Sequence, residues 1–351
     1  RSRRTAPRRR RTRSHCRSGE MFPRRLQASV RKFGTTSSSP LSWQPTGKPQ
    51  QTLASGVEKS GVGLHSGAST TVRLLPAMAG EGRYFSPGPG RPRIPATVDH
   101  VVESPLCTTL RRGAARVLTV EHLLSALEAS GVDNARLEID GGDEVPILDG
   151  SAREWVEAIE EAGLCAAKDH NGNEIAKLAT LIHEPMYVWR DDSFVAAFPQ
   201  RKTKITYGIS FPQVPAIGCR WFSCFPMDDL VYAEEIGPSR TFCIYEEIES
   251  LRNAGLIRGG SIENAIVCSG TTGWQNPPLR FHDEPCRHKI LDLIGDISLL
   301  SENGNQGLPI GHLIAYKAGH ALHAKFARHL KDLMMKLEPE MQPSVLKQLS
   351  A

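Results

Sequence analysis

Apolar and polar positions follow two periods along this chain, and the order in which the two periods occur is repeated. Over residues 51–76, apolar and polar residues alternate between glycine turns, which predicts a hairpin or meander of strands. Residues 80–100 are rich in Gly and Pro and predict a loop or a small pair of strands. A helix is predicted over residues 120–130, with Gly131 after it, and a strand over residues 134–139.

A second helix is predicted to open with a capping box, in which Ser151 is the N-cap and Glu154 lies three residues later, and to end at Ala162. The later half of the chain repeats this order of elements. Its predicted elements are strands at 180–190, 194–199 and 203–210, helices at 245–254 and 284–300, a strand at 312–316 and a helix that begins near 319–320. The repeat predicts an α+β fold of two similar domains, each a β-sheet layered with α-helices.

The length and composition of the chain are consistent with two domains. A chain of 351 residues, 40% of them hydrophobic, is long enough to bury a sizeable core in two domains. We expect an N-terminal domain over residues 51–170 and a C-terminal domain over residues 178–335, joined by a polar hinge at 166–177. Residues 1–50 are expected to form a disordered leader and residues 336–351 a tail.

The net charge of +5 is distributed unevenly along the chain. Residues 1–40 contain 13 of the 43 Lys and Arg residues and one acidic residue, Glu20, whereas residues 41–351 contain 30 basic and 37 acidic residues. The body of the protein is therefore acidic, which argues against a nucleic-acid partner, because such a protein carries basic charge on its folded surface. No apolar run approaches the roughly 20 residues that a membrane-spanning helix needs, so no transmembrane segment is expected.

The basic N-terminal arm has the composition of a targeting segment. Residues 1–20 consist largely of Arg runs, and Met21 resembles a natural start that is preceded by extra sequence. The stretch that follows is rich in Arg, Ser and Thr and lacks acidic residues, which predicts an organellar transit peptide within residues 21–45. We expect a mitochondrial location; a chloroplast address and a disordered basic tail are the alternatives.

The eight cysteines include no C-x-x-C pair and no regular spacing. This argues against a disulfide framework and a Cys-rich zinc site, and it favours a reducing compartment. Most of the cysteines are expected to be buried as small apolar residues.

A polar stripe on the predicted 284–300 helix is the first candidate for chemistry. His288, Asp292 and Asp296 are spaced at i, i+4 and i+8, so their side chains lie on one face. A His and a carboxylate one turn apart can bind one metal ion together. Taken alone, the stripe is also compatible with a solvated polar face that carries a His–Asp pair.

Glu121 and His122 stand at the first turn of the predicted 120–130 helix. Adjacent helical residues point about 100° apart, so the two side chains can divide the work, with His122 on a metal ion and Glu121 on a water molecule. The alternative is a Glu that complements the helix dipole beside a partly buried His.

His320 lies at a predicted strand-to-helix turn, where the helix N-terminus disfavours a charged imidazolium. A charged His320 therefore needs a carboxylate partner, for which Asp296 is the candidate; the alternative is a capping or surface histidine. Thr241 adds a hydroxyl at a polar-to-apolar junction. Together the motifs provide each role in metal-assisted amide hydrolysis: a three-ligand zinc site open to water, a carboxylate base, an imidazole acid and a hydroxyl for the oxyanion.

At these motifs the sequence resembles the UDP-3-O-acyl-N-acetylglucosamine deacetylases, over residues 51–335. The resembling segments follow one another in the family's order and spacing. They are SGVGLHSG (60–67), TVEHLLSAL (119–127), VPILDGSA (145–152), SRTF (239–242), GLIRGGS (255–261), LRFHDEPCRHKILDLIGD (279–296) and KAGHAL (317–322). The resemblance implies two similar domains with the active site between them, each with a small insert.

The resemblance implies a zinc ion on His122, His288 and Asp292, with Glu121 as general base and His320 as general acid. The implied reaction is hydrolysis of the N-acetyl group of UDP-3-O-acyl-N-acetylglucosamine by zinc-activated water. It yields UDP-3-O-acyl-glucosamine and acetate and is the committed step of lipid A biosynthesis. A His₂Asp site also accepts Fe²⁺, so the metal stays open. The expected partner is the UDP-linked acylated glucosamine, and the protein is expected to be a monomer.

The resemblance also implies roles for residues around the metal. Thr241 is expected to help stabilise the oxyanion, Asp296 to support His320, and Lys289 to lie near the nucleotide phosphate, which suits an ammonium point charge. The insert of the second domain, at 243–266, is implied to form an apolar passage for the acyl chain. The candidate substrate-binding residues of this passage are Leu64, Phe242, Ile248, Ile257 and Val267; ordinary core packing is the alternative.

Three features depart from the bacterial pattern of the family. The leader indicates a eukaryotic organellar member, similar to those of plant mitochondria. Cys243 stands where a Gly usually follows Arg-Thr-Phe, and Arg190 is the substitute for a family lysine that is missing from residues 189–193. Two other functions stay open: a zinc hydrolase for another N-acetylated sugar or amide, and a catalytically retired scaffold, although the latter would be expected to lose Glu121 or His320.

Overall fold

The computed structural model describes residues 39–276 and 278–336. The folded part begins earlier than predicted, because strand β1 (Leu41–Pro49) pairs antiparallel with β12 (Ala176–Ile182). The predicted disordered leader at 1–50 therefore extends too far at its C-terminal end, whereas the transit peptide within 21–45 stays a prediction. The two prolines of β1 disturb its register and hide the alternation, which is tolerated because β1 has only one partner strand. The predicted leader before residue 39 and the predicted tail after Lys336 lie outside the described residues.

Two five-stranded sheets confirm the predicted repeat. The strand order is β3-β4-β10-β5-β6 in the first half and β13-β14-β20-β15-β16 in the second. In both, the central strand is antiparallel to one neighbour and parallel to the other. The strands are β3 (Val57–Val62), β4 (Ser69–Pro76), β5 (Arg83–Ser86), β6 (Ile94–Pro95), β10 (Ala135–Asp140), β13 (Met186–Arg190), β14 (Ser193–Phe198), β15 (Lys204–Phe211), β16 (Gly218–Cys224) and β20 (His312–Tyr316).

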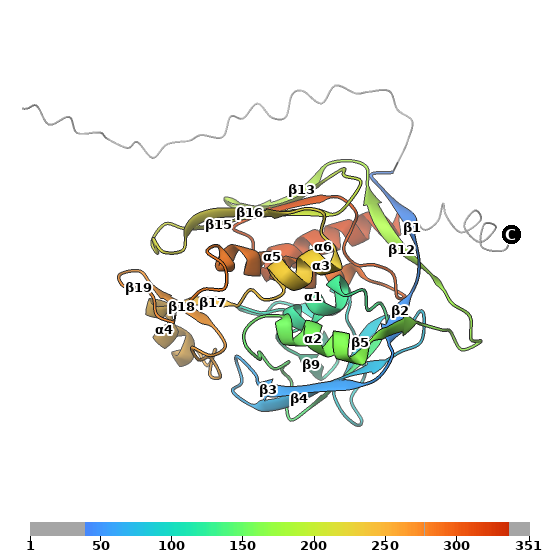
Figure 1. Cartoon of the computed structure of the whole chain (residues 1–351), viewed down its shortest axis with the longest axis horizontal. Helices are drawn as coiled ribbons and strands as arrows, with labels where there is room; N and C mark the ends of the chain where they lie inside the picture. The colour runs from blue at the N-terminus through green and yellow to red at the C-terminus, as the bar shows by residue number, and fades with distance from the viewer. Residues whose placement is uncertain (1–38, 277, 337–351) are drawn as a thin grey trace, which may run out of the picture. The chain divides into compact units, whose positions relative to one another are not determined.

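Each half contributes two long helices at equivalent places in the chain. These are α1 (Glu121–Ala129) and α2 (Arg153–Ala162) in the first half, and α5 (Glu284–Ile297) and α6 (His320–Met335) in the second. Figure 1 shows the sheets as outer layers, with β3 and β4 at the bottom, β15 and β16 at the top, and the helices between them. The fold is therefore α+β with two similar halves, as predicted.

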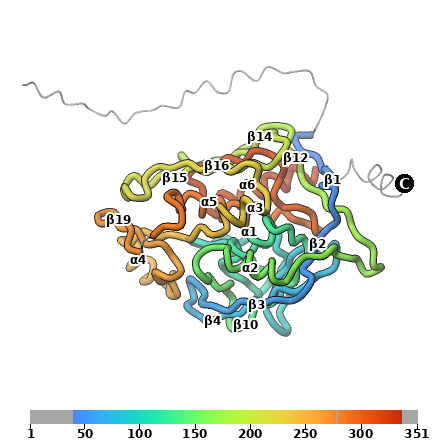
Figure 2. Tube along the Cα trace, in the orientation of Figure 1, coloured from blue at the N-terminus to red at the C-terminus, as the bar shows by residue number. Residues whose placement is uncertain are grey.

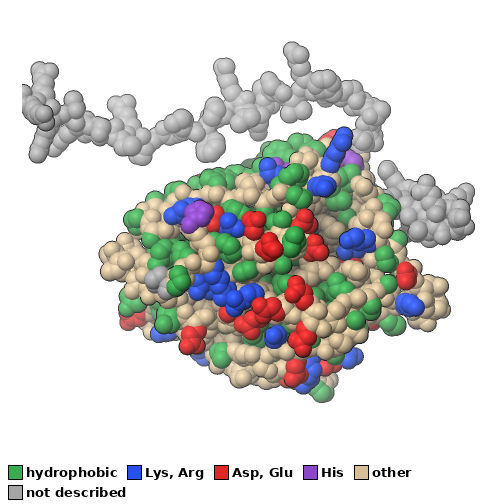
Figure 3. All heavy atoms as spheres, viewed as in Figure 1, with side chains coloured by type: hydrophobic (Ala, Val, Ile, Leu, Met, Phe, Trp, Pro, Cys, Tyr) green, Lys and Arg blue, Asp and Glu red, His purple; other side chains and the backbone are tan. Residues whose placement is uncertain are grey.

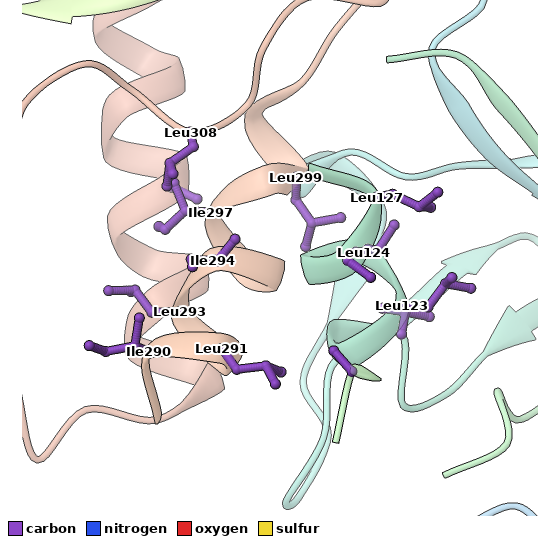
Figure 4. Packing of buried hydrophobic residues seen from close by; sticks show 14 of the residues in the cluster. Leu123, Leu124, Leu127, Ile290, Leu291, Leu293, Ile294, Ile297, Leu299 and Leu308 are labelled. Carbon is purple, nitrogen blue, oxygen red and sulfur yellow. The ribbon is translucent and has the colours of Figure 1, made fainter. Parts of the chain in front are cut away.

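The contact between α1 and α5 joins the two halves. The trace in Figure 2 brings these helices side by side although they are far apart in the sequence. Leucines and isoleucines of both helices are fully buried in a core that the two halves share; Figure 4 shows Leu291 extending from α5 toward α1, and Leu299 beside α1. Burial of each such side chain stabilises the fold by about 1.5–3 kcal/mol. The start of α1 is thereby held against the later turns of α5, where Gly295 lies next to Glu121.

A small three-stranded sheet is inserted before the central helix of each half. The first consists of β7 (Val101–Val102), β8 (Thr109–Arg112) and β9 (Ala115–Val117), and the second of β17 (Phe242–Ile244), β18 (Ile266–Ser269) and β19 (Gly273–Trp274). The second insert also carries α4 (Ile248–Asn253). The remaining elements are β2 (Gln51–Leu53), β11 (Leu164–Ala166), α3 (Asp229–Val231), a π-helical turn (Tyr232–Ile236) and 3₁₀ turns at Val98–His100, Tyr245–Glu247 and Ser298–Leu300.

Several predicted elements need correction. The predicted capping box is wrong: α2 has Ala152 as its N-cap, and the Ser151 hydroxyl instead donates a hydrogen bond to Asp149 (2.7 Å). The predicted strand 180–190 is two strands, β12 and β13, because the turn between them contains Pro185. The predicted 245–254 and 284–300 helices are each part α-helix and part 3₁₀ turn. The 51–170 and 178–335 domain boundaries stay a prediction.

The surface drawn in Figure 3 carries acidic side chains beside basic ones, in keeping with the balance of charge over residues 41–351. Within the described part of the chain, no helix combines the length and the apolar composition that crossing a membrane requires.

Candidate metal centre and active site

One cavity of about 480 Å³ contains all but one of the predicted site residues. It lies where α1, α5 and the start of α6 meet the second insert. The predicted residues that line it are Leu64, Glu121, His122, Thr241, Phe242, Ile248, Ile257, Val267, His288, Lys289, Asp292 and His320. Asp296 does not line the cavity; it is buried behind His320, to which it is hydrogen-bonded.

Three of these residues converge from two helices. One nitrogen or oxygen of each of His122, His288 and Asp292 lies within 4.8 Å of the others, and all three residues are buried. Asp292 Oδ1 is 3.4 Å from Nε2 of His288 and 3.6 Å from Nε2 of His122. The two imidazole rings stand nearly perpendicular, with centroids 4.9 Å apart. The i, i+4 spacing on α5 therefore acts together with a histidine from the other half of the chain.

The hydrogen bonds around His288 and Asp292 leave one nitrogen and one oxygen available to bind a metal ion. His288 Nδ1 lies 2.9 Å from the Ser239 carbonyl oxygen, so Nδ1 carries the proton and the lone pair of Nε2 faces Asp292. Burial lowers the pKa of His288 to about 4, which keeps the ring neutral near pH 7. Asp292 Oδ1 is buried without a hydrogen-bond partner among the described residues.

The charge state of Asp292 also suits a cation. Burial opposes its ionisation, but Lys289 and His288 outweigh burial and hold the pKa of Asp292 well below its usual value. Lys289 Nζ donates to Asp292 Oδ2 (2.6 Å), a contact that the sequence did not reveal. An ionised carboxylate oxygen without a donor, next to two imidazoles, is a donor set for Zn²⁺ or Fe²⁺.

The buried carboxyl group of Glu121 lies beside the three candidate ligands, between the Thr108 backbone and the His320 ring. Its Oε2 accepts a hydrogen bond from the backbone N–H of Thr108 (3.0 Å), and its Oε1 lies 3.8 Å from His320 Nε2. Burial raises the pKa of Glu121 to about 7, although His320 acts in the opposite direction. A carboxylate that exchanges a proton near neutral pH can act as a general base.

His320, the first residue of α6, is paired with Asp296 as predicted. Its Nδ1 donates to Asp296 Oδ2 at 2.8 Å. Burial disfavours the charged ring, but the carboxylates of Asp296 and Glu121 outweigh burial and raise the pKa of His320 to about 10. Asp296 is ionised, because His320 and His323, against burial, lower its pKa to about 2. His320 therefore holds a proton over the physiological range.

A second histidine, His323, binds the same carboxylate oxygen. Its Nδ1 lies 2.8 Å from Asp296 Oδ2, and the hydroxyl of Thr108 donates to the other oxygen, Oδ1. The Nδ1 atoms of His320 and His323 both donate N–H hydrogen bonds to Asp296, so neither offers a lone pair to a cation at this carboxylate. Sequence reasoning missed Thr108 and His323, although the spacing of His323 three residues after His320 was a signal that both lie on one helix face.

A carboxylate outside the cavity holds the loops that approach it. Glu144, buried, accepts hydrogen bonds from the backbone N–H groups of His65 (2.8 Å) and Ser66 (2.7 Å) and from the hydroxyl of Thr119 (2.9 Å). Thr119 has φ 55°, a left-handed conformation that turns the chain into α1 just before Glu121. The sequence gave no indication of this role.

The wall of the cavity along the second insert is largely apolar, although Glu247 and Arg252 also line it. Cys243 lines it next to the predicted passage residues, and burial raises the pKa of the Cys243 thiol to about 11, so the thiol stays neutral. Arg190 also lines the cavity. The side chains of Lys289 and Arg190 thus line the same cavity as the candidate metal ligands. Contacts of Lys289 with a phosphate and of Arg190 with the substrate stay predictions.

This arrangement can be compared with known proteins. The chain matches the family described as LpxC, UDP-3-O-acyl N-acetylglycosamine deacetylase, over residues 50–332. It belongs to this family.

Relatives at high identity come from plants and cyanobacteria. The chain is 56% identical over 307 residues to "Probable UDP-3-O-acyl-N-acetylglucosamine deacetylase 1, mitochondrial" of Arabidopsis thaliana, which covers 85% of this chain and 93% of the relative. It is 51% identical to the UDP-3-O-acyl-N-acetylglucosamine deacetylase of Trichormus variabilis, over 81% of this chain and 99% of that protein. The matched region of this deacetylase-family chain contains every candidate site residue.

Proposed function

We propose that this protein hydrolyses the N-acetyl group of UDP-3-O-acyl-N-acetylglucosamine, giving UDP-3-O-acyl-glucosamine and acetate, the committed step of lipid A biosynthesis. The observation that carries the proposal is the buried Asp292 Oδ1, which faces two imidazole nitrogens and has no hydrogen-bond donor among the described residues. It lies in a cavity shared with a carboxyl that can act as base and an imidazole that can act as acid. Membership of a deacetylase family supports the proposed substrate class.

The donor set would hold a divalent cation on His122, His288 and Asp292. Such a cation would lower the pKa of water toward 7 and polarise the amide carbonyl. Zn²⁺ is proposed, with Fe²⁺ as the alternative.

The protein's own residues supply the proton transfers. Glu121, with a pKa of about 7, accepts a proton from the attacking water. His320, kept protonated by Asp296, donates a proton to the nitrogen of the leaving amine, so that the C–N bond breaks without release of an amide anion. Thr241, on the cavity wall, is proposed to donate its hydroxyl hydrogen bond to the carbonyl oxygen as negative charge develops there.

The two ends of the substrate would occupy different walls of the cavity. The acyl chain is proposed to lie along the apolar residues of the second insert, because this insert supplies most of the apolar side chains that line the cavity. The diphosphate is proposed to lie near Lys289 and Arg190, two of the cationic side chains that line the same cavity.

The proposed location is mitochondrial. The composition of the leader supports this proposal, and so does the name of the Arabidopsis relative, which describes that protein as mitochondrial. Because β1 begins at Leu41 and belongs to the fold, cleavage of a transit peptide is expected before this residue. A monomer is proposed, because the candidate metal ligands, Glu121 and His320 all come from the same chain.

The test is a deacetylation assay of the purified, zinc-loaded protein beside Glu121→Ala and a surface control, Glu58→Ala. We expect metal binding in all three and turnover in the parent and the control alone. UDP is expected to compete with the substrate. A Glu121→Ala protein that binds metal and hydrolyses as fast as the parent contradicts the base assignment. Turnover of simple N-acetyl sugars without competition by UDP would favour the alternative zinc hydrolase.

A further inference from the structure

We propose that His323 is a positioning residue, which holds the Asp296 carboxylate in the orientation that His320 needs for proton donation. The inference rests on the proposed function for the meaning of His320, but its hydrogen-bond network is visible without turnover. None of the motifs that identify the family includes His323, which lies just beyond the KAGHAL segment.

His323 is completely buried, and both of its ring nitrogens have partners. Nδ1 lies 2.8 Å from Asp296 Oδ2, and Nε2 lies 3.0 Å from the hydroxyl oxygen of Tyr207 on β15. The Tyr207 hydroxyl also lies 2.6 Å from the carbonyl oxygen of Ala318, to which it donates. The network thus runs from a carboxylate beside the active site to the backbone turn that precedes α6.

A count of protons assigns the donor on the side of Asp296. The Ala318 carbonyl can only accept, so the Tyr207 hydroxyl donates its one proton to Ala318. The ionised Asp296 can also only accept, so Nδ1 of His323 carries the proton of the His323–Asp296 hydrogen bond. Tyr207 fixes the plane of the ring, and the N–H of His323 is thereby aimed at Oδ2.

The hydrogen bond from His323 restricts Asp296 at Oδ2, the oxygen that also binds His320. Oδ2 accepts from both His320 and His323, and Oδ1 accepts from the Thr108 hydroxyl, so the carboxylate is held at both ends. Without His323, one of the two bonds to Oδ2 is lost and the carboxylate can rotate. In the parent protein, His320 Nε2 lies 3.8 Å from Glu121 Oε1. Once the carboxylate rotates, the hydrogen bond from His320 Nδ1 would no longer hold Nε2 of the same ring in this position.

The same network reaches His320 through the backbone. Ala318 lies two residues before His320 in a turn where Lys317 has φ 50°, a left-handed conformation. The hydrogen bond from Tyr207 to the Ala318 carbonyl holds this turn against β15. His323 and Tyr207 therefore fix the backbone that carries His320 as well as the carboxylate that binds its ring.

The test compares His323→Asn, His323→Ala and Tyr207→Phe with the parent. The amide nitrogen of Asn can occupy the place of Nδ1 and donate to Asp296, whereas Ala cannot. We expect His323→Ala to lower kcat by about 10–100-fold, with KM within about twofold and unchanged metal content. His323→Asn is expected to recover most of kcat, and Tyr207→Phe to fall between the two.

A readout without turnover separates this inference from the proposed function. Nitrogen NMR of the histidine rings should show the Nδ1–H of His320 hydrogen-bonded in the parent and in His323→Asn, and weakened in His323→Ala. Loss of this signal in His323→Ala supports the inference even if the parent fails to deacetylate the proposed substrate. Should His323→Ala keep both the His320 signal and the parent kcat, or should Asn and Ala variants be equally impaired, the positioning role is refuted. If His323→Ala does not fold, His323→Asn is compared with Tyr207→Phe instead. A fall in kcat in Tyr207→Phe but not in His323→Asn supports the positioning role, whereas equal falls in kcat in both variants refute it.

Discussion

The backbone of Gly295 on α5 contacts the backbone of Glu121 at the start of α1. A Cβ atom added at Gly295 would overlap the Glu121 carbonyl oxygen and lie 3.0 Å from its Cα. Glycine is therefore required for this close approach of the two helices. Since Glu121 precedes His122, and Gly295 follows Asp292 within one turn, the contact sets the distance between the candidate ligands from the two halves of the chain.

Replacement of this glycine should open the site. Gly295→Ala is expected to separate α1 from α5, to lower the free energy of unfolding by about 1–3 kcal/mol and to weaken metal binding. Denaturant unfolding and metal analysis measure both effects. Gly319→Ala is the control, because a Cβ there meets no atom within 4 Å, and its stability should stay within about 0.5 kcal/mol of the parent. Equal losses in the two variants would contradict the helix-contact explanation.

The pH dependence of kcat/KM should be bell-shaped. Activity should rise with pH as Glu121 loses its proton, with a pKa of about 7 caused by burial, and fall as His320 loses its proton, with a pKa of about 10 caused by Asp296 and Glu121 against burial. A bound cation favours deprotonation of both groups and should move both limbs to lower pH. A profile that keeps rising above pH 10 would be inconsistent with His320 as the acid.

Removal of the Asp296 charge should shift one limb of this profile. Asp296→Asn deletes the main cause that raises the pKa of His320, so the alkaline limb should move to lower pH and kcat should fall by about 10–100-fold. Asp192→Asn is the matched control, because Asp192 is an exposed carboxylate bonded to Lys317 near the same turn. An alkaline limb that stays in place in Asp296→Asn would disprove the pairing.

Metal removal should affect both activity and stability. A chelator is expected to abolish turnover, and added Zn²⁺ to restore it. Because the ligands converge only in the folded chain, metal at 100 times its Kd should stabilise the fold by about 2.7 kcal/mol. Asp292→Asn should lose this stabilisation in a thermal unfolding experiment, whereas Asp283→Asn, just before the same helix, should keep it. Equal metal-induced shifts in both variants would exclude Asp292 as a ligand.

The identity of residue 243 should influence acyl preference. Cys243 is partly buried on the cavity wall, so Cys243→Leu should narrow the proposed passage. We expect kcat/KM for long acyl chains to fall by roughly tenfold or more relative to short ones. Cys165→Leu, an exposed position away from the cavity, should leave the ratio unchanged. The measurement is kcat/KM over a series of acyl lengths. An unchanged ratio of kcat/KM for long and short acyl chains in Cys243→Leu would mean that the acyl chain binds elsewhere.

Local pattern was sufficient for much of the fold. The alternation over residues 312–316 predicted β20 with its observed bounds, and α1 lies within the predicted helix because apolar residues recur at helical spacing. Strand β1 was not predictable in this way, since its two prolines and its glycine conceal any period, and its one strand partner among the described residues is β12, more than 120 residues later. The misplaced cap at Ser151 has the same cause: a tertiary contact, Arg280 with Asp149, competes for the side chains there.

By itself the sequence determined the α+β repeat, the polar stripe on α5 and the residue types for metal-assisted hydrolysis, because these depend on neighbours within a few residues. Only the tertiary structure decided that His122 meets Asp292, that Thr108 and His323 hold Asp296, and that Glu121 is buried enough to have a pKa of about 7. Such contacts join residues separated by long stretches of chain, and the close approach at Gly295 that permits them arises only when the two halves pack. Burial and hydrogen bonding at those contacts shift the protonation of the side chains, so the chemistry of the site is a property of the packed molecule.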